Sequence, residues 1–131
     1  VSQAHTPTER HMDAHMMTKV AIGLFALAAL GGVTMLFQVF RGADRPWSWL
    51  AMGHGFLAAA GLTLLVYAAT MSGVAQMVNI GLVVLLAAAA GGATLALKYH
   101  VRMLPLSRTL VLGHAALAVV GFVLVLVGAR G

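Results

Sequence analysis

The sequence predicts an all-α integral membrane protein, a four-helix transmembrane bundle made of two tandem-duplicated helical hairpins. The first indication is composition: of 131 residues, 61% are hydrophobic, only 8% are charged, and the mean hydropathy is +0.96. Soluble globular domains are far more polar than this. The second indication is four apolar segments, each close to the about 20 residues that a helix needs to cross a hydrocarbon core. The four segments cover residues 20–40, 49–70, 78–97 and 110–129, and each is long enough to form such a helix.

An internal repeat with an offset of sixty residues is the third indication. Residues 50–61 read LAMGHGFLAAAG, and residues 110–121 read LVLGHAALAVVG. His54 in the first stretch corresponds to His114 in the second. Four glycine pairs keep the same offset: Gly31 and Gly91, Gly32 and Gly92, Gly53 and Gly113, and Gly61 and Gly121. Self-similarity at a fixed period indicates duplication of a structural unit. We therefore expect repeat 1 at about residues 20–70 and repeat 2 at about residues 78–130.

The four spans leave little chain for anything else. We expect a polar N-terminal tail over residues 1–19 and a four-span membrane domain over residues 20–131, with no room for a soluble catalytic domain. The chain contains no cysteine, which excludes disulfides, iron–sulfur clusters held by thiolates and zinc sites built on Cys. The isoelectric point near 10.9 does not indicate nucleic-acid binding, because the basic residues flank the apolar spans. Basic residues at these places are explained by the orientation of the spans in the membrane.

The polar tail carries a candidate second metal site. Thr8 is expected to cap a short helix, in which His11 and His15 lie four residues apart on one face and Met12 and Met16 on the neighbouring face. A histidine pair with this spacing can bind Zn²⁺ or Cu²⁺, and methionine suits Cu(I). The alternative is an amphipathic turn at the membrane interface with incidental histidines.

The loops predict the topology. The connections at residues 41–48 and 98–108 hold five of the eight Lys and Arg residues, whereas the connection at residues 71–79 has no charge. Cytoplasmic loops are enriched in Lys and Arg, so both basic loops are expected in the cytoplasm and both termini outside, in a bacterial-type inner (plasma) membrane. Trp47 and Trp49 fall where an interfacial aromatic belt is expected.

The two repeated histidines are the candidate site. His54 and His114 are expected at matching depth within the second and fourth spans, and an ionisable residue inside a span usually faces the bundle interior. Glycines next to each histidine and seven residues beyond it would leave a flat slot beside the imidazole, as a macrocycle requires. Small residues also let helices pack closely without any ligand, which is the alternative for these positions. The glycines are Gly53, Gly61, Gly113 and Gly121.

Several partners could satisfy two imidazoles in a membrane. The rings could bond to each other or to backbone carbonyls as a purely structural pair. A haem b on the pseudo-twofold axis would take one axial imidazole from each repeat. Zn²⁺ prefers four ligands, and His100 is the only obvious third. A chlorophyll-type pigment pair, with one magnesium per histidine, also fits the symmetry, and binding of no cofactor is the remaining alternative.

Four spans with histidines on the second and fourth, and glycines on the histidine stripe, resemble a small membrane cytochrome b of the cytochrome b561-like family. The resemblance covers all four spans but depends on His54, His114 and the glycines. It implies haem b with these two histidines as iron ligands. That family commonly has two histidine pairs, and here there is no second pair within the spans. His100, Arg102 and Arg108 follow the third span, where they could meet haem propionates, as could Arg41 or Arg45 in the first loop.

The sequence favours a redox carrier over a stand-alone enzyme. All three acidic residues lie outside the spans, so no intramembrane acid–base pair is available. A bis-histidine iron has no open position, which argues against oxygen chemistry at the metal. We expect a single haem that carries one electron, to or from quinone or another membrane subunit, in an oligomer or complex. The alternatives are a non-enzymatic assembly or anchor subunit of a larger membrane complex, and a metal-handling membrane protein.

Overall fold

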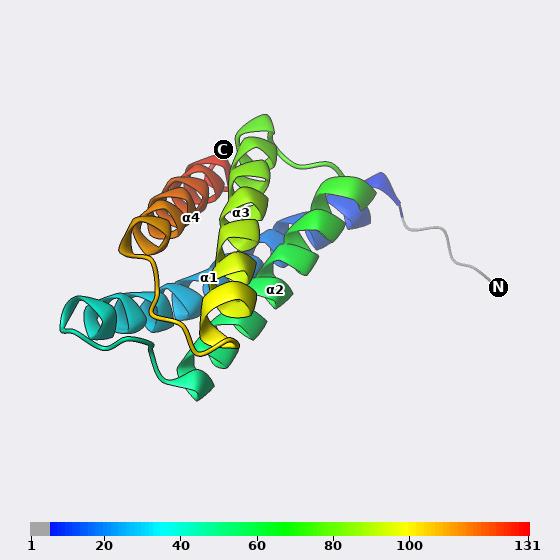
Figure 1. Cartoon of the computed structure of the whole chain (residues 1–131). Helices are drawn as coiled ribbons and strands as arrows, with labels where there is room; N and C mark the ends of the chain where they lie inside the picture. Colours follow the sequence, from blue (N-terminus) through cyan, green and yellow to red (C-terminus); the bar gives the residue numbers. More distant parts are fainter. Residues whose placement is uncertain (1–5) are drawn as a thin grey trace.

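The chain folds as four long helices connected by short loops (Figure 1). A computed structural model describes residues 6–131, except the side chain of His11. The helices are α1 (Pro7–Phe40), α2 (Ser48–Met71), α3 (Gln76–Thr94), which continues as the π-helical segment η1 (Leu95–His100), and α4 (Arg108–Gly128). Four helical segments are long and apolar enough to cross a membrane, with η1 completing the third. The part of the chain that the structure describes contains no strand.

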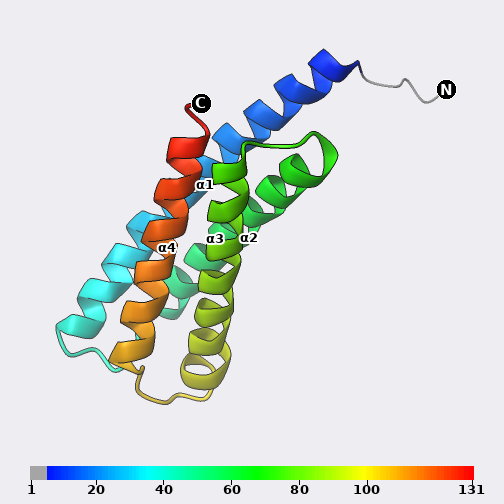
Figure 2. The ribbon, with the colours of Figure 1, turned by 90° about the horizontal axis from the view of Figure 1, so that it is seen from above.

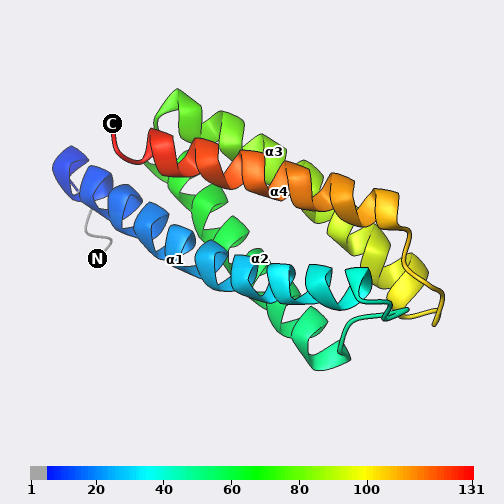
Figure 3. The same ribbon diagram turned by 90° about the vertical axis from the view of Figure 1, so that its left-hand side faces the viewer.

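Helix α1 begins earlier than the sequence indicated. Thr6, not Thr8, is the N-cap: its hydroxyl accepts from the backbone N–H of Glu9, and a Glu9 carboxylate oxygen accepts from the Thr6 N–H at 2.6 Å. This capping box, with Pro7 in the first turn, satisfies N–H groups that a helix start leaves free. The 34 residues that follow form one helix of about 51 Å. Residues 7–19 of the expected polar tail therefore form the polar N-terminal part of helix α1, which projects beyond the other helices (Figures 2 and 3).

The third helical segment ends later than expected. The sequence predicts Lys98 and His100 in the connection at residues 98–108, but they belong to η1, which runs directly on from α3. The wider π-helical turns end at Val101, whose backbone N–H bonds to the carbonyl of Ala96. The connection between η1 and α4 is correspondingly short. It lies at the same end of the molecule as the α1–α2 loop (Figure 2).

The helices are arranged as two hairpins, α1 with α2 and α3 with α4 (Figure 3). Both hairpins bury residues at positions related by the offset of sixty. The buried pairs are Thr18 and Val78, Ala21 and Gly81, Phe25 and Leu85, Ala28 and Ala88, Gly61 and Gly121, and Leu65 and Val125. The hairpins thus use the same faces for packing, as the internal repeat requires.

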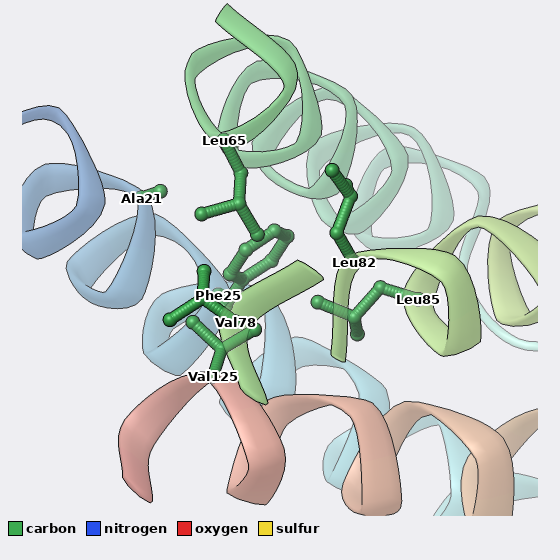
Figure 4. Packing of buried hydrophobic residues seen from close by; sticks show 7 residues of the cluster. All are labelled: Ala21, Phe25, Leu65, Val78, Leu82, Leu85 and Val125. Atoms are coloured by element: carbon green, nitrogen blue, oxygen red, sulfur yellow. The ribbon is translucent and has the colours of Figure 1, made fainter. Parts of the chain in front are cut away.

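The core between the hairpins lies towards the end that carries the two termini. Figure 4 shows Phe25 beneath Leu65, next to Val78 and Val125. Leu65 is eleven residues beyond His54 in α2, which is about 16 Å along the helix. The tightest apolar packing and the two histidines therefore occupy different halves of the bundle. The full cluster comprises Ala21, Phe25, Leu65, Val78, Leu82, Leu85 and Val125.

Candidate functional site

The imidazoles of His54 and His114 meet between the two hairpins. His54 lies in the second turn of α2, and His114 lies at the same point of α4. Their ring centroids are 6.1 Å apart, and the ring planes are inclined by 80°. Both residues are partly buried. The structure thus brings together the two histidines that the repeat singled out.

Each imidazole is held by the other helix of its own hairpin. Nδ1 of His54 lies 2.7 Å from the carbonyl oxygen of Ala28, and Nδ1 of His114 lies 2.7 Å from that of Ala88. Because a carbonyl can only accept, Nδ1 carries the proton in both rings and Nε2 is the basic nitrogen of the neutral imidazole. Within residues 6–131, Nε2 of neither ring has a hydrogen bond. A carbonyl bond of this kind fixes the tautomer and orientation of many metal-ligating histidines.

Glycines of α1 and α3 make room for the rings. A Cβ atom at Gly32 would lie 3.2 Å from Cε1 of His54, and one at Gly92 would lie 2.9 Å from Cε1 of His114. The preceding glycines, Gly31 and Gly91, would each place a Cβ 3.6 Å from the histidine Cβ. Their conserved offset of sixty showed that they belong to the repeat, but not that they face the histidines. That assignment needed the relative rotation of the paired helices.

The glycines seven residues beyond the histidines have other neighbours. A Cβ at Gly61 would lie 2.8 Å from Cε1 of Phe25, and one at Gly121 would lie 2.8 Å from Cγ of Leu85. Of the two roles considered for these positions, close helix packing within a hairpin is the one that these contacts support. Gly53 and Gly113, in contrast, have open space at the Cβ position, with no atom within 4 Å beyond the local backbone.

The residues expected near haem propionates lie at the loop end of the bundle. His100 is bound through Nε2 to the hydroxyl of Ser48 at 3.1 Å, which connects η1 to the first hairpin. Its Nδ1 is buried and has no partner. Arg108 lies over the ring of Phe40, 5.9 Å from the centroid, and Arg102 is exposed. Since Ser48 begins α2 six residues before His54, this group lies about 9 Å from the imidazoles along the axis.

The second candidate metal site is only partly described. His15 lies on the exposed surface of α1, whereas the side chain of His11 lies outside the described residues, so this pair stays a prediction. In the part of the chain that the structure describes, no group of three or more His, Cys, Asp or Glu side chains could hold a metal ion. The central site therefore offers two imidazole nitrogens and no further protein ligand of these types.

No protein-family model matches the chain, and neither does any curated protein or solved structure.

Proposed function

We propose that the chain is a membrane b-type cytochrome that carries one electron on a single haem, with His54 and His114 as the axial ligands. The observation that carries this proposal is the pair of imidazoles 6.1 Å apart, each held at Nδ1 by a backbone carbonyl. An imidazole in this state directs a basic Nε2 away from its carbonyl partner, as metal ligation requires. A structural pair would need only the carbonyl bonds and would leave both Nε2 atoms unused.

The number of donors favours haem over a bare metal ion. Structural Zn²⁺ sites use four protein ligands and catalytic ones three, and the described residues provide no third His, Cys, Asp or Glu at this point. Haem iron already has four porphyrin nitrogens and needs from the protein only axial ligands. Two equivalent imidazoles from two equivalent hairpins therefore match haem, and a tandem duplication would create such a pair in one step.

The chain's own residues orient the two proposed ligands. A haem bound there supplies reversible one-electron redox chemistry. The carbonyls of Ala28 and Ala88 hold the two rings, and Gly32 and Gly92 let helices α1 and α3 approach them. All three acidic residues lie outside the apolar spans, so the bundle has no carboxylate relay for coupled proton transfer. This favours simple electron carriage, with quinone or another membrane subunit as the exchange partner.

The proposed location is a bacterial-type inner membrane, with the two basic loops in the cytoplasm and both termini outside. The four apolar helices support multi-pass insertion. The charge distribution supports the orientation, because both loops at one end of the bundle are basic.

Absorbance spectroscopy of the purified protein tests the function. We expect a Soret band that shifts on reduction, with sharp α and β bands. His54→Ala and His114→Ala should each remove the haem or leave it five-coordinate. His100→Ala and His15→Ala are matched controls and should keep the wild-type spectrum, because these histidines lie outside the central pair.

Two results would contradict the assignment. Equal haem retention in all four variants would rule out His54 and His114 as ligands. A protein that inserts and folds but takes up no haem would favour the non-enzymatic anchor subunit, or a chlorophyll-type pigment if one co-purifies.

A further inference from the structure

The two basic loops lie at the same end of the bundle (Figure 2), and hydrogen bonds link them. The backbone N–H of Leu106 donates to the carbonyl of Asp44 at 3.2 Å, and His100 bonds to Ser48 at 3.1 Å. Next to these links lies an open depression of about 810 Å³. Its lining consists of Asp44, Arg45, Pro46, Trp47, Ser48, Trp49 and Met103. We call this feature the loop-end depression.

The charge around the loop-end depression is strongly positive. Five of the eight basic residues of the chain belong to this end, against one of its three acidic residues, Asp44. Within residues 6–131 no salt bridge neutralises any of these cations. Arg45 is the cation that lines the depression, and it is partly buried there. The basic residues are Arg41, Arg45, Lys98, Arg102 and Arg108.

Two tryptophans form an apolar wall beside this charge. The rings of Trp47 and Trp49 are stacked, with centroids 5.9 Å apart and planes inclined by 21°. They are nevertheless 60% and 68% exposed. The backbone N–H of Trp47 donates to the side-chain carbonyl of Gln38 at 3.1 Å, which anchors the pair to the end of α1. Stacked, exposed indoles next to cations suit a ligand that is part apolar and part anionic.

We propose that the loop-end depression binds the headgroup of an anionic phospholipid. Arg45 contacts the phosphate, since a guanidinium offers paired donors to its oxygens. Trp47 and Trp49 contact the glycerol and the first acyl carbons. A free phosphate would leave both indoles exposed, so the lipid is the better match. This proposal rests on the membrane location in the proposed function but not on the haem.

Comparison of the two repeats shows that this site is not a by-product of the duplication. The positions equivalent to Arg45, Trp47 and Trp49 are occupied in the second repeat by a proline, a serine and a threonine. The cation and both indoles therefore occur together in one hairpin only. A single lipid per chain is the expected stoichiometry.

Quenching of tryptophan fluorescence by brominated lipids tests the proposal. Trp47 and Trp49 are the only tryptophans of the chain, so its tryptophan emission comes from this depression alone. The purified full-length chain is reconstituted in phosphatidylcholine with increasing fractions of brominated phosphatidylglycerol. The reverse mixture, with the bromine on phosphatidylcholine, gives the relative binding constant. Each sample is normalised to the same mixture without bromine, which removes any constant quenching by haem.

We expect brominated phosphatidylglycerol to quench the wild type well beyond its share of the bilayer. Arg45→Gln should lower the relative binding constant about fivefold, which corresponds to one basic residue at an anionic surface. Arg130→Gln is the matched control, because it removes a cation at the opposite end, and it should leave the constant unchanged. Circular dichroism of each variant checks that the helical bundle is intact.

Three outcomes would overturn the proposal. The first is equal quenching by the two brominated lipids in the wild type. The second is an equal decrease in Arg45→Gln and Arg130→Gln, which indicates general attraction of a basic protein to an anionic bilayer. The third is loss of the preference when inorganic phosphate is added, which indicates a site for the free anion. Absence of haem from the protein would not change any of these readings.

Discussion

The contact between Gly92 and His114 gives the sharpest test of the site geometry. A Cβ at Gly92 would lie 2.9 Å from Cε1 of the imidazole, and ordinary van der Waals contact begins at 3.4 Å. Gly92→Ala must therefore displace the ring or helix α3 by about 0.5 Å, the difference between these distances. A ligand constellation tolerates errors of about 0.5 Å, so this substitution reaches the limit.

The equivalent substitution in the first repeat is milder. At Gly32 the Cβ would lie 3.2 Å from Cε1 of His54, so a shift of about 0.2 Å restores contact. Gly23→Ala is the matched control, because a Cβ at Gly23 has no atom within 4 Å beyond its own helix. Overpacking of a filled interior commonly costs about 1–3 kcal/mol. When this free energy is lost from haem binding, the haem affinity of Gly92→Ala falls about 5- to 150-fold, because each 1.4 kcal/mol corresponds to about a tenfold change.

Haem titration of the three apoproteins in detergent measures this series. We expect affinity to decrease in the order Gly23→Ala, Gly32→Ala, Gly92→Ala, with the first equal to the wild type. Equal haem affinity in Gly23→Ala and Gly92→Ala would refute the reasoning, because the added methyl group would then not displace the His114 imidazole. A large loss in Gly23→Ala would also refute it.

Further predictions concern packing and the orientation of the rings. Gly61→Leu should destabilise the bundle by about 1–3 kcal/mol with or without haem, since the new side chain meets Phe25 at once; thermal unfolding followed by circular dichroism checks this, and Phe25→Ala should partly rescue the variant. Undiminished stability would show that the helices are further apart than the structure places them. Because the planes of His54 and His114 are inclined by 80°, the oxidised haem should give a strongly anisotropic low-spin EPR signal. A moderately rhombic signal, typical of parallel ligand planes, would contradict this arrangement.

The sequence alone predicted the helices and the pairing of the histidines. The four apolar segments are four long helices, each long and apolar enough to cross a membrane, and a helix satisfies its backbone polar groups within the segment, as a membrane span requires. An offset of sixty places His54 and His114 at the same point of α2 and α4, because the two helices begin at Ser48 and Arg108, which are also sixty residues apart. The helix ends were less predictable: α1 begins at Pro7 and η1 extends to His100, because polar residues near an interface do not themselves end a helix.

Only the tertiary structure decided what each glycine and each imidazole touches. Gly61 shares a helix face with His54, yet its neighbour is Phe25, whereas the imidazole lies against Gly32. Helical periodicity determines which residues share a face of one helix. Which residue of the neighbouring helix each of them contacts depends on how that helix is rotated and where the two helices cross. The carbonyls of Ala28 and Ala88 likewise have no side-chain signal in the sequence. They accept from the histidines because glycines beside them let α1 and α3 approach α2 and α4, and that approach is a property of the packed hairpins.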